Sequence, residues 1–129
     1  MNDIFIDSSA WIEYFMGSEK GRKVREHIHK EGIKIFTTGI VVAEVCTKFL
    51  KDGLSAAEAM VAIRSLARTI NFDAQLGFQT AVAYVAERKK KPKLGLIDAH
   101  IIAVAAHLDS KVLTCDYDFS GISNVILIK

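Results

Sequence analysis

Short apolar runs alternate with longer amphipathic stretches along the whole chain. Five runs predict buried strands: "IFI" at 4–6, "IKIF" at 33–36, "TINF" at 69–72, "KVLT" at 111–114 and "NVILI" at 124–128. The stretches between them predict helices at about 10–15, 19–32, 40–51, 56–67, 74–90 and 96–108. Apolar strands separated by helices indicate an α/β fold with a parallel sheet covered on both faces.

Polar residues and glycines at the helix ends support these boundaries. Ser8 and Ser9 are good N-cap types for the first helix, and Asp73 can cap the fifth. An S-x-x-E capping box opens the fourth helix at Ser55. Gly32 is a C-cap signal for the second helix. The sequence has no repeat or linker, so residues 1–129 are expected to form one domain.

Composition narrows the class of protein. Half of the 129 residues are hydrophobic, which is enough for a core without cross-links, and two cysteines do not make a disulfide framework. No apolar run reaches the roughly 18 residues of a membrane span. The start, "MNDIFIDSS", lacks the basic and apolar regions of a signal peptide, so a cytoplasmic location is expected. The net charge of +2 does not by itself indicate a nucleic-acid partner.

Acidic residues occur where an unpaired charge is unfavourable. Asp7 and Asp116 follow directly after predicted strands, at the edge where open α/β sheets bind ligands. Glu44 and Asp98 interrupt apolar helices, where burial of a charge without a partner costs several kcal/mol. Lys48 is four residues from Glu44 but lies further along the helix.

One explanation covers the four acids together: they meet and bind a divalent cation, Mg²⁺ or Mn²⁺, which prefer hard oxygen ligands. Each acid also has a simpler interpretation. Asp7 and Asp98 are possible helix caps, Glu44 can extend towards solvent, and Asp116 with Asp118 can form a turn. Four such coincidences in four separate apolar settings are less plausible than one shared site.

The chain resembles PIN-domain ribonucleases, and among them most closely the single-domain VapC-like toxins. The matching segments are, in order, "FIDSSAWIEYF", "TGIVVAEV", "LGLIDAHIIAVAAHL" and "VLTCDYDFSGI". The resemblance implies a three-layer α/β/α sandwich with a five-stranded parallel sheet of order 3-2-1-4-5. Strands 1 and 4 are then neighbours, which places Asp7 and Asp116 on adjacent strands about 5 Å apart in the pairing direction.

By the same resemblance, Asp7, Glu44, Asp98 and Asp116 are the catalytic, metal-binding acids of a Mg²⁺-dependent endoribonuclease. Asp118 matches a position that the family often fills with a further acid or a histidine, and Ser9 matches a hydroxyl residue near the site. Ser9 and Thr114 are candidates for hydrogen bonds to the acids. For Thr114, a plain strand residue is the favoured interpretation.

The densest charge run, "ERKKKPK" at 87–93, precedes the helix of Asp98. Lys89, Lys90, Lys91 and Lys93 are therefore candidates for contacts with RNA phosphates, although basic residues also complement a helix C-terminus. Aromatic residues at 11, 14 and 15 are weaker candidates for base stacking, because aromatic residues on a helix are usually core. His100 is two residues from Asp98 and is not expected to be a ligand.

Three functions remain open at this stage. The first is the toxin of a toxin–antitoxin pair, for which the resemblance implies a homodimer and a small VapB-like antitoxin. The second is a PIN nuclease that processes RNA without an antitoxin. The third is a non-catalytic, receiver-like binding module, which also gathers acids at strand ends but needs a late lysine where this chain has "VLTCDYDF".

Overall fold

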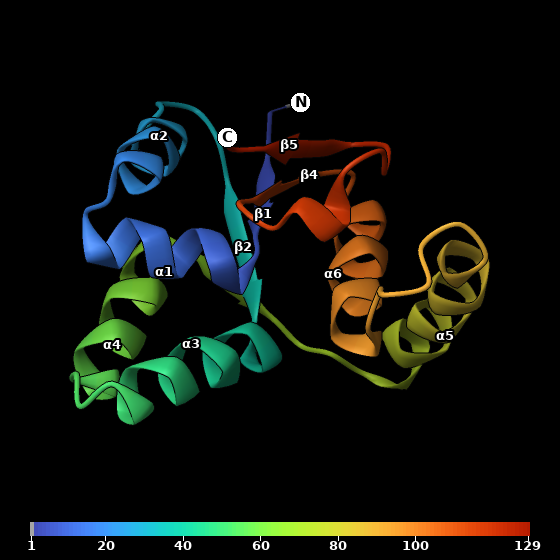
Figure 1. Ribbon diagram of the computed structural model, residues 1–129, viewed down its shortest axis with the longest axis horizontal. Coiled ribbons are helices and arrows are strands. Elements are labelled where there is room, and N and C mark those ends of the chain that lie inside the picture. The colour runs from blue at the N-terminus through green and yellow to red at the C-terminus, as the bar shows by residue number, and fades with distance from the viewer. Residues whose placement is uncertain (1) are drawn as a thin grey trace.

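The computed structural model describes residues 2–129, in which strands and helices alternate as the hydrophobic pattern predicts (Figure 1). The strands are β1 (Ile4–Ile6), β2 (Ile35–Thr38), β3 (Arg68–Ile70), β4 (Lys111–Thr114) and β5 (Val125–Leu127). The helices are α1 (Ser8–Met16), α2 (Glu19–Ile28), α3 (Gly39–Lys51), α4 (Ala56–Leu66), α5 (Ala74–Arg88) and α6 (Leu96–His107), with a 3₁₀ turn η1 (Tyr117–Phe119).

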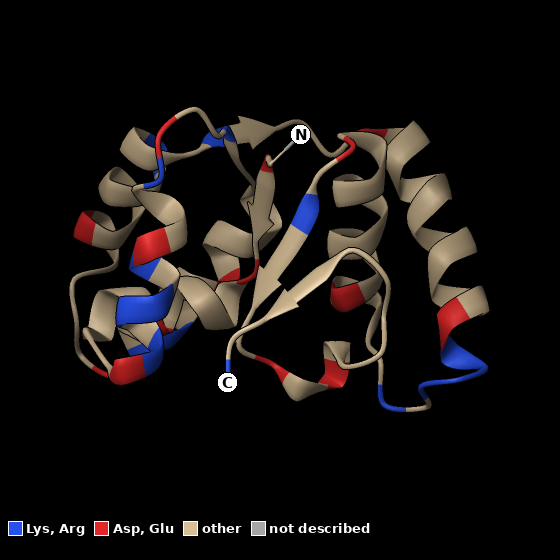
Figure 2. Cartoon of the chain, turned by 90° about the horizontal axis from the view of Figure 1, so that it is seen from above, with Lys and Arg blue, Asp and Glu red and all other residues tan. Residues whose placement is uncertain are grey.

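The five strands form one parallel sheet in the order β3-β2-β1-β4-β5, as the resemblance implied. Helices α1 to α4 lie on one side of the sheet and α5 and α6 lie on the other, which gives three layers (Figures 1 and 2). The strand order changes direction between β1 and β4, so the carboxyl ends of these two strands form the switch point of the sheet.

The core is built around the central strand and the helices packed on it. All three residues of β1 are buried, and α6 contributes Ile101, Val104 and Ala105 to the same core. Complete burial of a side chain such as that of Phe5 stabilises the fold by roughly 1.5–3 kcal/mol. Strand β1, which leads to Asp7, and helix α6, which carries Asp98, are therefore held firmly in the core.

Helix α1 begins differently from the prediction. Asp7 rather than Ser8 or Ser9 is the N-cap residue, with an extended backbone at φ −71° and ψ 156°. Its carbonyl oxygen accepts hydrogen bonds from the backbone N–H groups of Ala10 and Trp11, both at 3.1 Å. Ser8 and Ser9 already have helical positions, and their hydroxyl groups are free to bond elsewhere.

Several other boundaries also differ, among them the ends of β3 at Ile70 and of α5 at Arg88, each two residues earlier than predicted. Helix α2 ends at Ile28, because Gly32, with φ +80°, lies in the turn that follows rather than at the helix end. Strand β2 begins at Ile35 and continues through Thr37 and Thr38, which are fully buried. Threonine is β-branched and suits a strand, so the predicted strand was placed two residues too early.

The predicted caps of the later helices are confirmed. The side chain of Asp73 accepts a hydrogen bond from the backbone N–H of Leu76 at 3.0 Å, and Ser55 accepts one from Glu58 at 3.2 Å. Each such cap contributes on the order of 1 kcal/mol.

Helices α1 and α2 approach each other closely at Gly21. A Cβ atom at this position would lie 2.0 Å from the carbonyl oxygen of Glu13, so only glycine fits. This contact fixes the start of α2, including Lys20, beside α1. Within residues 2–129, none of the helices is long and apolar enough to cross a membrane.

Candidate active site

Asp7 is a buried carboxylate at the end of β1, with only 4% of its surface exposed. Its Oδ2 atom accepts hydrogen bonds from the hydroxyl groups of Ser9, at 2.8 Å, and Thr114. Its Oδ1 atom accepts a third from Ser8 at 3.3 Å. Hydroxyl donors, rather than a cationic side chain, therefore satisfy this charge within the described part of the chain.

Thr114 connects Asp7 to the next acid. The pairing of Ile6 with Leu113 places Asp7 beside Thr114, the last residue of β4. The Thr114 hydroxyl donates to Asp7 and accepts the backbone N–H of Asp116 at 3.0 Å. Thr114 is thus more than the plain strand residue that the sequence favoured. Asp116 does not lie directly across from Asp7, because it comes two residues after β4 ends, as the cap of η1.

Ser9 joins α1 to the same edge of the sheet. Its hydroxyl donates to Asp7 and accepts the backbone N–H of Cys115 at 3.0 Å, and it lies 3.2 Å from the Thr114 hydroxyl. The two residues singled out as hydrogen-bond candidates thus both contact Asp7. Asp118 lies in η1, exposed, and its backbone N–H donates to Asp116 Oδ1 at 2.9 Å.

Asp98 lies in the first turn of α6 and is half-buried. Its Oδ2 atom accepts the backbone N–H of Gly95 at 3.1 Å, so the helix-cap interpretation is correct as far as it goes. Burial is the main cause that raises the pKa of Asp98, and the negative charges of Asp7, Asp116 and Asp118 raise it further. The hydrogen bond from Gly95 acts in the opposite direction and lowers it. Asp98 therefore caps its helix and also belongs to a shared acidic neighbourhood.

Glu44 reaches this neighbourhood from α3. Burial raises its pKa most, the hydroxyl of Ser8 opposes this effect, and the charges of Asp7 and Asp98 add to it. Lys48 forms its ion pair with Asp52, at 3.1 Å, instead of with Glu44. The four predicted acids thus come from four separate parts of the chain and influence one another across the switch point.

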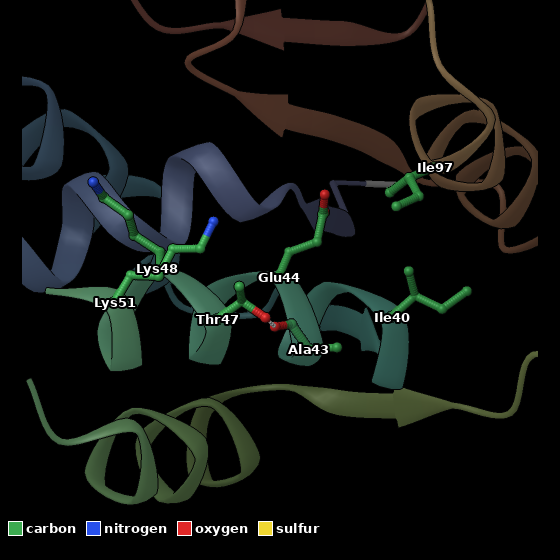
Figure 3. Close-up of a pocket in the computed structure, with 7 residues that line it drawn as sticks. All are labelled: Ile40, Ala43, Glu44, Thr47, Lys48, Lys51 and Ile97. Atoms are coloured by element: carbon green, nitrogen blue, oxygen red, sulfur yellow. Dashed lines mark hydrogen bonds between the residues drawn. The ribbon is translucent and has the colours of Figure 1, made fainter. Parts of the chain in front are cut away.

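A hollow of about 370 Å³ opens beside Glu44 (Figure 3). It is lined by Ile40, Ala43, Glu44, Thr47, Lys48, Lys51 and Ile97. Ile97, from α6, lies across from Ile40 at one end, and the two lysines extend at the other. Apolar walls on one side of Glu44 explain why burial is the largest cause of its raised pKa.

The donor set fits a hydrated Mg²⁺ or Mn²⁺ ion. Among residues 2–129, no three His, Cys, Asp or Glu side chains are gathered closely enough to enclose a metal. Mg²⁺ keeps several waters and needs only one or two direct carboxylates, so an enclosing group is not required. Cys115 adds no thiolate, because burial raises the pKa of its thiol to about 11.

His100 is a structural residue behind the acids. It is buried between Phe5 and Phe72, and burial lowers its pKa. Its Nδ1 atom donates to the carbonyl oxygen of Ile97, so its Nε2 atom accepts from the Thr38 hydroxyl at 2.9 Å. Since Thr38 is the N-cap of α3, this contact ties the helix of Glu44 to the helix of Asp98.

The basic run lies at the rim of the acidic site. Lys90, Lys91 and Lys93 line a hollow of about 300 Å³ with Pro92, Leu94, Tyr117 and Asp118. Figure 2 shows the basic loop and the acids that follow β4 at the same edge of the molecule. Lys89 lines a different hollow, with Tyr84, Val85 and Arg88. Three of the four candidate lysines, Lys90, Lys91 and Lys93, therefore lie beside η1.

The aromatic residues of α1 belong to the core. Trp11 is fully buried and stacks on Phe15 at 5.9 Å between ring centroids, so a base cannot stack on it. The exposed aromatic residue at the site is Tyr117, with 57% of its surface accessible. The sequence pattern did not single it out, although it stands between two acids in "CDYDF".

The protein is a three-layer α/β domain with acidic side chains at the switch point of its parallel sheet and lysines at the rim of that site. A family profile described as the PIN domain matches residues 4–125. This match covers nearly the whole chain, so the protein belongs to the PIN-domain family.

Solved structures of similar fold include proteins from toxin–antitoxin systems. A toxin–antitoxin complex from Klebsiella pneumoniae contains a chain that is 25% identical, with a TM-score of 0.73 and 98% of each chain covered. A Mycobacterium tuberculosis VapC described as a toxin that cleaves the sarcin–ricin loop is 23% identical, with a TM-score of 0.76, and 98% of this chain and 99% of that chain are covered. A chain of VapBC2 from Rickettsia felis, bound to a promoter DNA fragment, is 18% identical with a TM-score of 0.73. The match covers 97% of this chain and 96% of that chain. No curated protein sequence matches.

Proposed function

We propose that this protein is a Mg²⁺- or Mn²⁺-dependent endoribonuclease and the toxin of a toxin–antitoxin pair. The observation that carries the proposal is that four acids, Asp7, Glu44, Asp98 and Asp116, lie around the switch point of a PIN-domain sheet. The Thr114 hydroxyl connects Asp7 to the backbone of Asp116, and the charges of neighbouring acids raise the pKa values of Glu44 and Asp98. The toxin of known RNA-cleaving activity among the similar structures supports the same reaction.

The acids share two roles in this proposal, metal binding and proton acceptance. Asp7, Glu44, Asp98 and Asp116 would hold the cation, one or two of them directly and the others through its water molecules, with Asp118 as an additional acid at the rim. When bound, the cation lowers the pKa of water and stabilises negative charge on the phosphodiester. A carboxylate that is not a direct ligand accepts the proton of the attacking water. Ser9 and Thr114 keep Asp7 in one orientation through their hydrogen bonds.

The raised pKa values of Glu44 and Asp98 suit this function. Burial raises both pKa values most, and repulsion by the negative charges of neighbouring acids raises them further. A divalent cation relieves that repulsion, so its binding stabilises the native state. The basic rim compensates for the acids in a second way, because Lys90, Lys91 and Lys93 can contact the phosphates of RNA.

A homodimer and a small VapB-like antitoxin complete the proposal. The similar structures include toxin–antitoxin complexes, which supports an antitoxin for this chain as well. An arginine of the antitoxin that enters the acidic site would pair with its carboxylates. Exposed apolar side chains on α5, those of Phe78, Val82 and Val85, support a contact between two copies.

The first prediction tests the reaction itself. Purified protein should cleave single-stranded RNA with Mg²⁺ or Mn²⁺ and lose this activity in EDTA. Since water is the nucleophile, the products should carry 5′-phosphate and 3′-hydroxyl ends, which end-labelling and mass spectrometry can identify. A 2′,3′-cyclic phosphate product would mean that the 2′-hydroxyl of RNA attacks, and the mechanism would be wrong.

A further inference from the structure

Tyr117 is held rigidly at the rim of the acidic site. The turn that carries it, η1, is closed by a hydrogen bond from the Phe119 N–H to the Asp116 carbonyl oxygen at 3.1 Å. The Phe119 side chain next to it is fully buried and anchors the turn in the core. The Tyr117 ring nevertheless remains exposed. An exposed aromatic ring on an anchored turn can bind a planar group with little loss of conformational entropy.

Cationic side chains flank this ring from two parts of the chain. The Lys20 ammonium group, from α2, lies 5.3 Å from the centroid of the Tyr117 ring. Lys90, Lys91 and Lys93, from the loop between α5 and α6, share a hollow with the ring. The close packing at Gly21, the next residue along the chain, fixes the backbone from which the Lys20 side chain extends. The ring therefore lies among cations although its neighbours in sequence, Asp116 and Asp118, are both acids.

This combination is typical of a site for single-stranded nucleic acid. Such sites hold the phosphates with basic side chains and stack the bases on aromatic rings, with little preference for sequence. The acids that adjoin the ring would then face the backbone next to the stacked nucleotide. An acidic peptide could use the lysines, but the aromatic ring beside them favours a nucleotide.

We propose that Tyr117 is a stacking residue that positions one nucleotide of a single-stranded RNA at the acidic site. Lys20 and the group Lys90, Lys91 and Lys93 would contact the neighbouring phosphates. This inference rests on the proposed ribonuclease function and adds to it a positioning residue and a second basic element. Stacking fixes the base, so it places the adjoining phosphodiester next to the carboxylates.

A double-mutant cycle between the ring and a base tests the proposal. The probe is a fluorescein-labelled single-stranded RNA of about twelve nucleotides, within the range of such sites, with a set of copies that each lack one base. Binding is measured by fluorescence anisotropy in the Asp98→Asn background, so that the RNA stays intact. Tyr117→Ala and removal of the stacked base should each weaken binding by about 5- to 150-fold. Together they should weaken it no more than either alone.

Two control variants sharpen the test. Tyr117→Phe retains the ring and should bind like the parent protein. Tyr84 also has a cation over its ring, with Arg88 at 5.1 Å, but its hollow contains no acid, so Tyr84→Ala should leave binding unchanged. Additive losses from Tyr117→Ala and base removal, equal losses in the Tyr84 variant, or no RNA binding at all would overturn the proposal.

The outcome is distinguishable from failure of the ribonuclease function. Cleavage by the wild-type protein without coupling between Tyr117 and a base would overturn the stacking proposal alone. Coupling without any metal-dependent cleavage would overturn the ribonuclease function and leave Tyr117 as part of an RNA-binding site.

Discussion

At the scale of single residues, Asp98 combines two interactions that the sequence presented as alternatives. It accepts the Gly95 N–H, as a helix cap does, and its pKa is raised by burial and by three other acids. Replacement of Asp98 by asparagine can separate its role as a helix cap from its role in the acidic site. Asparagine caps a helix about as well as aspartate but carries no charge.

The second prediction concerns Asp98→Asn. Cleavage should be abolished, whereas the metal-free variant should be as stable as wild type or slightly more stable, because one repelling charge is removed. Mg²⁺ at ten times its Kd should stabilise wild type by about 1.4 kcal/mol, a few degrees in Tm, and the variant by less. Cleavage assays and melting curves with and without Mg²⁺ measure both effects.

Asp73→Asn is the matched control for this substitution. Asp73 is the N-cap residue of α5 and accepts the Leu76 N–H, whereas Asp98 is the third residue of α6 and accepts the N–H of the N-cap residue Gly95. Both carboxylates thus close a first helical turn, but Asp73 is not among the acids that shift the pKa of Asp98. This variant should keep full activity and the full response to Mg²⁺. If Asp98→Asn behaves in the same way, Asp98 is only a cap.

The third prediction uses the raised pKa of Glu44. Native Glu44 holds its proton more strongly than the unfolded chain does, where the pKa is about 4.3. The native state is therefore stabilised below this pH, and that stabilisation is lost as the pH rises through the raised native pKa. In EDTA, Glu44→Gln should therefore gain stability relative to wild type as the pH rises above the pKa of the unfolded chain. Urea unfolding at several pH values measures this difference, and a difference that does not change with pH would contradict it.

At the scale of elements, the basic segment between α5 and α6 divides into two parts. Lys90, Lys91 and Lys93 face Tyr117 and Asp118, whereas Lys89 faces Tyr84 and Arg88 on α5. A helix-dipole role would depend mainly on closeness to the end of α5, and would make Lys89 the most important residue. A phosphate-binding role makes the other three most important.

The fourth prediction separates these two roles. Joint replacement of Lys90, Lys91 and Lys93 by Ala should weaken RNA binding and reduce the slope of log Kd against log salt concentration by about 2, at about 0.7 per lost contact. Lys89→Ala should change the slope much less. Titrations at several salt concentrations provide the slopes, and an unchanged slope in the triple variant would favour the dipole role.

At the scale of the whole molecule, α5 presents an unpaired apolar face. Phe78, Val82 and Val85 are spaced by four and three residues, so they share one side of the helix, and Phe78 is 68% exposed. The other side of α5 packs on α6. A second copy that covers this face would bury these three side chains.

The fifth prediction is that Phe78→Asp converts a homodimer into a monomer, because the new charge would be buried at the interface without a partner. Leu50→Asp is the control, since Leu50 on α3 is equally exposed but lies on the opposite side of the sheet (Figure 1). Sedimentation velocity distinguishes the two states. A wild-type monomer, or dissociation by both variants, would contradict an α5 interface.

The sequence by itself indicated the order of the elements, apart from some of their boundaries, and the four acids proposed for the site. Hydrophobic periodicity follows directly from which faces are buried, so strands such as β4 and caps such as Asp73 could be read locally. The acids stood out because a charge in an apolar segment is unfavourable without a reason. The order of the sheet came from the family resemblance, since local patterns do not specify which strands are neighbours.

Only the tertiary structure decided which side chains meet. Thr114 and Ser9 bond to Asp7 because the register of β1 against β4 places them together, and register depends on long-range pairing. The contact of His100 with Thr38 joins residues 62 positions apart. Lys20 and Tyr117 are neighbours for the same reason, because the packing of α2 on α1 brings the backbone of Lys20 close enough for its ammonium group to reach the ring. The sequence could name Ser9 and Thr114 as candidates, but the contacts themselves depend on three-dimensional packing, which local spacing along the chain does not specify.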